Sequence, residues 1–139
     1  MDLIEVVLWI KIIVTIVAWA GPFLFAPQFI LEALLPQVPK PLLWLRMLGL
    51  AWFALIVGYA SGLHQLRTQG EFPFGIVYMG ILSNGGAGSI LLLGLLTGNE
   101  AVSGSKVGTP LIVVSIILLL SITAGLVLTL IPQLNEKTL

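Results

Sequence analysis

The sequence contains no cysteine and only one histidine, His64. The absence of cysteine excludes disulfide bonds, thiolate metal sites and thiol nucleophiles from this chain. One histidine cannot supply two axial haem ligands or a histidine cluster for zinc. No paired carboxylates, nucleophile triad or phosphate-binding loop motif is recognisable either. We therefore expect no catalytic residue, no metal site, no cofactor and no enzymatic activity.

Charged residues are also scarce. They make up 9% of the 139 residues, whereas a soluble domain has about 25%. Hydrophobic residues account for 58%, and the mean hydropathy is +1.12. Six Lys and Arg residues balance six Asp and Glu residues, so net charge does not draw the chain to nucleic acid. A soluble fold would have too little polar surface, so the composition predicts an integral membrane protein whose surroundings are a lipid bilayer.

Four long apolar runs fill most of the chain. A hydrocarbon core about 30 Å thick needs about 20 helical residues to cross it, and each run has that length. The sequence therefore predicts an all-α fold, an integral membrane four-helix up-down bundle that forms a single transmembrane domain. The predicted spans cover residues 3–23, 42–63, 74–96 and 111–131.

The first span has two alternative frames. A helix over 3–23 includes Lys11, whereas one over 12–31 is free of charge but is crossed by Pro22 and Pro27. Proline usually bends or ends a membrane helix. We favour the earlier frame and expect the helix to end around Gly21-Pro22.

The connections between the spans carry their own signals. Residues 27–35 are apolar on one side and too short to span, so they form either a short amphipathic helix in the interface or a buried loop segment. The proline-rich residues 36–41 predict a stiff link to the second span. We expect a short polar loop to begin at residues 64–67, and Pro132 to end the fourth span.

Lys11 lies about 12 Å into the first span, at a rise of 1.5 Å per residue. An ionised lysine at mid-membrane costs about 2.5–3.5 kcal/mol, so such residues usually face a bundle interior or a water-filled path. In the alternative interpretation the long side chain reaches the nearer headgroups. The later frame for the first helix would likewise make Lys11 an interfacial anchor.

Five polar residues share one depth in an up-down bundle. Measured from the face that holds both termini, Lys11 lies eight residues deep and the others lie eight to ten residues deep. We hypothesise that they form one polar layer, in which the asparagine oxygen accepts a hydrogen bond from the ammonium group. The candidate residues are Lys11, Ser83, Asn84, Ser121 and Thr123.

Glycines recur at helical spacing in the second and third spans. Small residues on one helical face let membrane helices approach closely. An unwound segment that exposes its backbone to an ion or substrate is the alternative. A mid-membrane asparagine such as Asn84 needs a partner across a helix interface, within the chain or in a second copy. The candidate packing residues are Gly58, Gly62, Gly80, Gly85 and Gly88.

The middle of the chain has a recognisable pattern. The motif LFAPQF leads to the proline-rich link, then to LRMLGLAWFALIVGYASG and GIVYMGILSNGGAGSILLLGLLTG. This stretch, about half of the chain, resembles the small, mostly uncharacterised DoxX-like four-helix membrane proteins of bacteria. The resemblance implies a four-helix bundle in the bacterial inner membrane and, in some members, an accessory role beside membrane redox enzymes. It carries over no catalytic residue.

Three functions follow as expectations. The favoured one is a non-enzymatic accessory or structural subunit, or a small self-assembling membrane protein, within a homo-oligomer or larger membrane complex. The alternative is a small oligomeric transporter or channel that uses Lys11 and Asn84. The third is a lipid- or quinone-binding protein beside a membrane oxidoreductase, with Trp19 and Trp52 lining a groove. None of the three involves nucleic acid.

Overall fold

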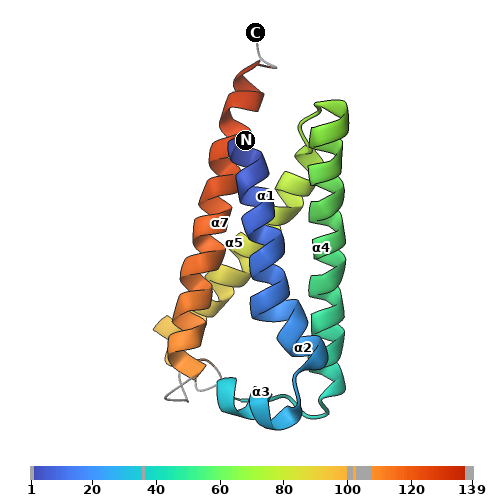
Figure 1. Cartoon of the computed structure of the whole chain (residues 1–139). Helices are drawn as coiled ribbons and strands as arrows, with labels where there is room; N and C mark the ends of the chain where they lie inside the picture. The colour runs from blue at the N-terminus through green and yellow to red at the C-terminus, as the bar shows by residue number, and fades with distance from the viewer. Residues whose placement is uncertain (1, 36, 100–101, 103–107, 137–139) are drawn as a thin grey trace.

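A computed structural model shows an all-helical chain and describes residues 2–35, 37–99, 102 and 108–136 (Figure 1). Four helices are long and apolar enough to cross a membrane, which confirms the all-α prediction with four helices of spanning length. The first of them is continuous but changes geometry along its length. The elements are α1 (Leu3–Val14), the π-helical turn η1 (Thr15–Ala20), α2 (Gly21–Phe25), α3 (Gln28–Leu34), α4 (Leu43–Gln69), α5 (Phe74–Leu96) and α7 (Gly108–Glu136).

The long helices run up and down side by side (Figure 1). Both ends of the chain and the connection from α4 to α5 lie at one end of the bundle, which we call the terminal end. The short α3 crosses the other end. The first helix contacts α4 and α7, and α7 makes its most extensive contact with α5. The helices therefore enclose one shared interior, which is centred on α1.

The first helix continues through Gly21 and Pro22 to Phe25, so the prediction that it ends around Gly21-Pro22 is wrong. The chain accommodates the proline by widening the turn before it. In that turn the N–H of Gly21 bonds to the carbonyl of Ile16, five residues back. A Cβ atom at Gly21 would lie 2.7 Å from the Ile16 oxygen. Only glycine fits there, and Pro22 then lies in the first turn of α2, where its missing N–H costs little.

Two other helix ends differ from the predictions. The predicted polar loop at 64–67 is part of α4, which continues to Gln69 and ends at Gly70 with φ of +68°, a common left-handed helix cap. The helix α7 continues past Pro132 to Glu136, so that proline does not end it. Residues 27–35 contain the helix α3, one of the two expected alternatives. Within the predicted proline-rich link, residue 36 lies outside the described part of the chain.

The interior is mostly apolar, as in a soluble bundle, but the outer surface is apolar too, and a lysine and an asparagine are buried. Large apolar side chains point outward on every long helix: Val17 is 69% exposed, Leu82 78% and Ile117 59%. Lys11 and Asn84, in contrast, are 0% exposed. Water would not favour this arrangement, because it leaves apolar surface solvated and a charge desolvated.

Candidate functional site

Among the described residues, the buried polar side chains are those of Lys11, Thr15, Asn84 and Thr129. Thr129 bonds to its own helix, and the candidate site is built around Lys11 on α1. Its side chain is wholly enclosed by α1, η1, α4 and α5. Within the described residues, the ammonium has no acidic partner, because the ion pair found there joins Arg67 to Glu5. We call Lys11 and its five neighbours Thr15, Trp19, Trp52, Tyr59 and Asn84 the lysine centre.

Asn84 on α5 is the hydrogen-bond acceptor for Lys11. The ammonium nitrogen donates to Oδ1 of Asn84, and Nδ2 of Asn84 donates to the carbonyl of Gly80 at 2.5 Å. The two bonds together fix the orientation of the amide. An ammonium can only donate, so the amide oxygen must face Lys11, and the amide nitrogen then faces the carbonyl of Gly80. Asn84 thus connects the first and third long helices through a charge-assisted hydrogen bond, which is stronger than a neutral one.

Three aromatic rings complete the surroundings of the ammonium. Its nitrogen lies 5.6 Å from the ring centroid of Trp19, 5.3 Å from that of Trp52 and 5.4 Å from that of Tyr59. The two indoles stack on each other with centroids 5.5 Å apart. The negative face of an aromatic ring attracts a cation, by about 2 kcal/mol or more when the pair is desolvated. The centre therefore stabilises one positive charge without placing a negative charge beside it.

The π-helical turn η1 brings Trp19 to this centre. Lys11, Thr15 and Trp19 are spaced by four residues, and each four-residue step in an α-helix overshoots a full turn by about 40°. A π-turn closes with i→i+5 bonds, so the chain rotates less about the helix axis per residue than in an α-helix. Four residues of π-turn therefore rotate by less than a full turn, which brings Trp19 back to the face of the helix that carries Lys11. All three side chains are buried as a result.

Thr15 is the exception within this polar group. Its hydroxyl oxygen is buried and is the one such side-chain atom in the described residues without a hydrogen-bond partner. It lies one turn beyond Lys11 on the same helical face. An unpaired buried hydroxyl costs free energy, so Thr15 does not contribute to the stability of the lysine centre as Asn84 does.

Tyr59 belongs to the centre although the sequence analysis did not include it. Its hydroxyl lies 3.2 Å from Oγ of Ser83, and its side chain is fully buried. The predicted second span ended at residue 63, which placed Tyr59 too close to the terminal end. Since α4 continues to Gln69, Tyr59 lies ten residues from that end, as deep as Asn84 is from Phe74. A correct helix end would have revealed this residue.

The structure brings together only part of the predicted polar layer. Lys11 contacts Asn84, and Ser83 joins through Tyr59. Ser121 is exposed on α7 and does not belong to the layer. Thr123 donates to the carbonyl of Leu119 on its own helix at 2.8 Å and lies beside Gly85 of α5. The interpretation of Lys11 as a residue that reaches the headgroups does not fit its complete burial.

The predicted packing glycines lie at helix contacts inside the chain. A Cβ at Gly80 would meet Leu126 of α7 at 2.6 Å, and one at Gly88 would meet Leu120 at 2.9 Å. Gly85 faces the same helix less tightly. On α4, a Cβ at Gly58 or Gly62 would meet side chains of α5. The close approach of α5 to α7 explains Gly80, Gly85 and Gly88, and the contact of α4 with α5 explains Gly58 and Gly62, without a second copy of the chain.

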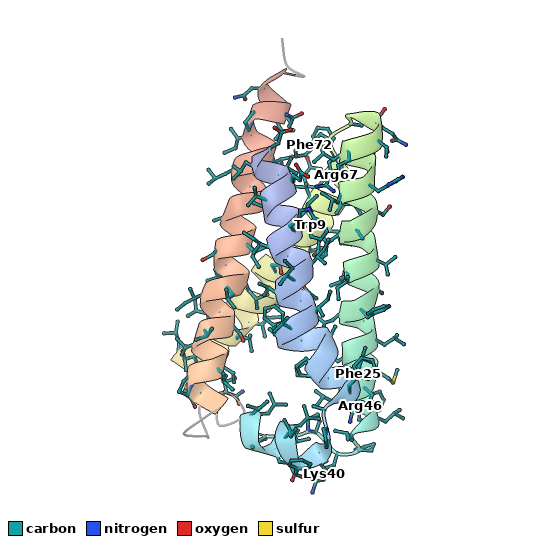
Figure 2. The ribbon with its side chains drawn as sticks, viewed as in Figure 1. Trp9, Phe25, Lys40, Arg46, Arg67 and Phe72 are labelled. Carbon is teal, nitrogen blue, oxygen red and sulfur yellow. The ribbon has the colours of Figure 1, made fainter. Side chains whose placement is uncertain are left out.

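Two arginines hold the ends of the bundle. At the terminal end, Nε of Arg67 donates to Glu5 at 2.7 Å and the guanidinium lies over the ring of Trp9. Figure 2 shows Arg67 and Trp9 near each other at this end. At the other end, Arg46 donates to the carbonyls of Phe23 and Ala26 at 2.7 Å each, where the first helix ends (Figure 2). The two bonds from Arg46 satisfy carbonyls that the end of the first helix leaves without partners.

Comparisons of the chain with protein-family models, with curated proteins and with solved structures find no match. The resemblance to DoxX-like proteins therefore stays a prediction from the sequence. Within the described residues, no three His, Cys, Asp or Glu side chains lie close enough to hold a metal ion. The lysine centre is the strongest candidate site that the geometry provides.

Proposed function

We propose that the chain is an integral membrane protein with four spans, held together by the lysine centre, and that it acts without catalysis as an accessory or self-assembling subunit. The observation that carries this proposal is the apolar outer surface: large apolar side chains point outward, while Lys11 and Asn84 are fully buried. Lipid is the solvent that favours such a surface. The resemblance to DoxX-like proteins supports a bacterial inner membrane as the location.

The short helix α3 suits a position in the membrane interface. Leu31 of this helix is buried, while Phe29 and the hydrogen-bonded pair Gln28 and Glu32 are exposed. An amphipathic segment that lies across the end of a bundle has this division of faces. In this arrangement α3 follows the headgroup boundary at the end of the bundle opposite the termini.

A packing role fits how the lysine centre is built. Lys11 and Asn84 are 73 residues apart in the sequence, and their contact joins the first and third long helices at one register. A single buried polar pair can specify helix partners in this way. The outward faces of the bundle are then available to lipid, to further copies of the chain or to a larger membrane complex.

Fractionation and mass measurement test this proposal. The chain expressed in bacteria should remain in the membrane pellet at alkaline pH and dissolve only in detergent. Light scattering in detergent should then give one defined copy number, alone or with a stoichiometric partner. Recovery as a stable monomer in detergent-free buffer would overturn the membrane assignment. A broad, concentration-dependent range of sizes would contradict the proposed subunit role.

Transport is a second candidate, because the lysine centre is a positive site at mid-depth without a carboxylate. A vesicle flux assay separates the two functions. An anion flux that the Lys11→Met variant abolishes would favour transport, and the absence of flux in both proteins supports the packing role. The matched control is Ser121→Ala, which alters an exposed hydroxyl on α7 at the same depth.

A further inference from the structure

A pocket separate from the lysine centre lies at the end of the bundle opposite the termini. It has a volume of about 260 Å³ and is bounded by the first helix, by α3 and by the start of α7. In Figure 1 the lower ends of α7 and α2 lie on either side of this region, with α3 below them. The lysine centre borders this pocket through one residue, Trp19, which lines the pocket and also faces the ammonium of Lys11.

The lining of this pocket is apolar and uncharged. It consists of aliphatic and aromatic side chains, two small residues, a proline and one hydroxyl, that of Ser115. An engineered apolar cavity of about 150 Å³ already takes up benzene, so the available space exceeds that of a single ring. A pocket with this lining selects an alkyl chain, because every polar group placed there would lose its hydrogen bonds.

The rim of the pocket is continuous with the outward apolar surface. Val17 on the first helix and Val114 on α7 both line it, and they are 69% and 52% exposed. On its inner side lie Trp19 and Leu31, which are almost fully buried. Access is therefore from the side of the bundle, through the surface that the proposed function assigns to lipid.

We propose that this pocket holds one acyl chain of a membrane phospholipid, which enters sideways from the bilayer beneath α3. The inference rests on the proposed membrane location. Van der Waals contact with the apolar lining binds the chain, while the headgroup stays at the interface beside α3. None of the described residues that line the pocket is charged, so the lining gives no basis for selecting a headgroup and we expect recognition of the chain rather than of the lipid class.

Photolabelling in vesicles tests this inference. The full chain is reconstituted into phosphatidylcholine vesicles with a small fraction of phosphatidylcholine that carries a diazirine in one acyl chain. After illumination, labelled peptides are mapped by mass spectrometry. We expect label at the recessed pocket residues Trp19 and Leu118 in excess of label at Leu82, which is 78% exposed on α5.

A matched pair of variants shows whether the label comes from the pocket. Ala18→Phe fills the rim of the pocket and should reduce label at Leu118 about tenfold, because the ring displaces several methylene groups of the chain. Ala124→Phe adds the same ring to an exposed position of α7 outside the pocket and should leave the label unchanged. Ser115→Leu fills the pocket with a smaller side chain than Ala18→Phe and should also reduce the label at Leu118. Circular dichroism verifies that each variant is folded.

The outcomes separate this inference from the proposed function. A chain that does not partition into vesicles contradicts the membrane assignment itself. A chain that partitions but carries label evenly over its outward surface, unaffected by Ala18→Phe and Ser115→Leu, contradicts only the acyl-chain site. Loss of label when one equivalent of an isoprenoid quinone is added would also overturn it, since the pocket would then prefer a different ligand.

Discussion

Two cationic side chains in this bundle lie against tryptophan rings, and different groups stabilise their charges. Arg67 at the terminal end is about half exposed and pairs with the carboxylate of Glu5 beside Trp9. Lys11 in the interior is fully buried and has an amide and three rings but no carboxylate. At the end of the bundle an opposite charge balances the cation, whereas in the interior dipoles and ring faces stabilise it.

The difference follows from the cost of desolvation. A carboxylate beside Lys11 would add attraction but would also have to leave water, and the second desolvation can exceed the gain. An amide and aromatic rings carry no net charge, so they cost less to bury. The interior therefore keeps one uncompensated positive charge if Lys11 is protonated. Loss of a single neutral partner should consequently matter more at Lys11 than loss of the charged partner at Arg67.

The largest expected effect comes from Asn84→Leu, which removes the acceptor and leaves the lysine buried without a hydrogen bond. We expect the free energy of unfolding to fall by about 3 kcal/mol. Unfolding in mixed micelles, followed by circular dichroism, measures the change. The double variant Lys11→Met with Asn84→Leu should recover most of this loss, because it removes the charge and its acceptor together. A double variant as unstable as Asn84→Leu would show that the pair itself is not the cause.

Lys11→Met should have a smaller effect, of about 1–2 kcal/mol. It loses the hydrogen bond and the ring contacts, but it also removes the buried charge and leaves only Asn84 partly unsatisfied. The same unfolding experiment measures it, and the emission of Trp19 and Trp52 reports the changed surroundings. An unchanged unfolding free energy would mean that the lysine centre does not stabilise the bundle.

Gly21→Ala tests the π-turn that brings Trp19 to the interior. The new Cβ would meet the Ile16 carbonyl, so the turn must shift, at a cost of about 1–2 kcal/mol. Thermal unfolding in detergent measures the change. Gly86→Ala is the matched control, because a Cβ there meets nothing within 4 Å. The control should be neutral or stabilising by up to about 1 kcal/mol, as helix propensity favours alanine. Equal losses in both variants would contradict a specific role for the turn.

Glu5→Gln should cost about 0.5 kcal/mol or less, since the arginine of this ion pair is half exposed and surface ion pairs contribute little to stability. Added salt should reduce even this difference, because it screens exposed charges. The measurement is unfolding at low and high ionic strength, with the wild-type protein as the reference. A loss as large as that of Asn84→Leu would remove the contrast between the two cations.

The smallest effect is expected from Thr15→Val. The substitution keeps the branched shape and removes a buried hydroxyl that has no partner, so stability should stay the same or rise slightly. Comparing the thermal unfolding midpoints of the variant and the wild-type protein detects whether stability rises or falls. A clear loss of stability would show that the Thr15 hydroxyl does take part in the lysine centre.

Much of this architecture could be predicted from the sequence. The lengths of the apolar runs predict the four long helices, and residue depth predicts that Lys11 and Asn84 lie at one level. Depth alone does not say which way a side chain faces around its helix. For this reason Ser121, at the right level, turned out to be exposed, and Thr123 bonds to its own backbone. Angular placement depends on how the helices pack, which residue counting does not include.

The aromatic part of the lysine centre was harder to predict. Trp19 reaches the ammonium only because the turn before Gly21 is widened, and a Gly-Pro pair in the sequence indicates a helix end as readily as a π-turn. Tyr59 was missed because the end of α4 was placed too early. In both cases a local backbone feature determines whether an aromatic ring lies inside the bundle.

The separation of Lys11 from Asn84 along the chain has a consequence for biosynthesis. Asn84 leaves the ribosome 73 residues after Lys11, which corresponds to roughly 4–15 seconds of translation at ordinary rates. Throughout that interval the nascent first helix carries an ammonium without its amide acceptor. The bundle therefore closes around its lysine only after the third long helix has been made, and any truncation before residue 84 leaves the charge permanently without that partner.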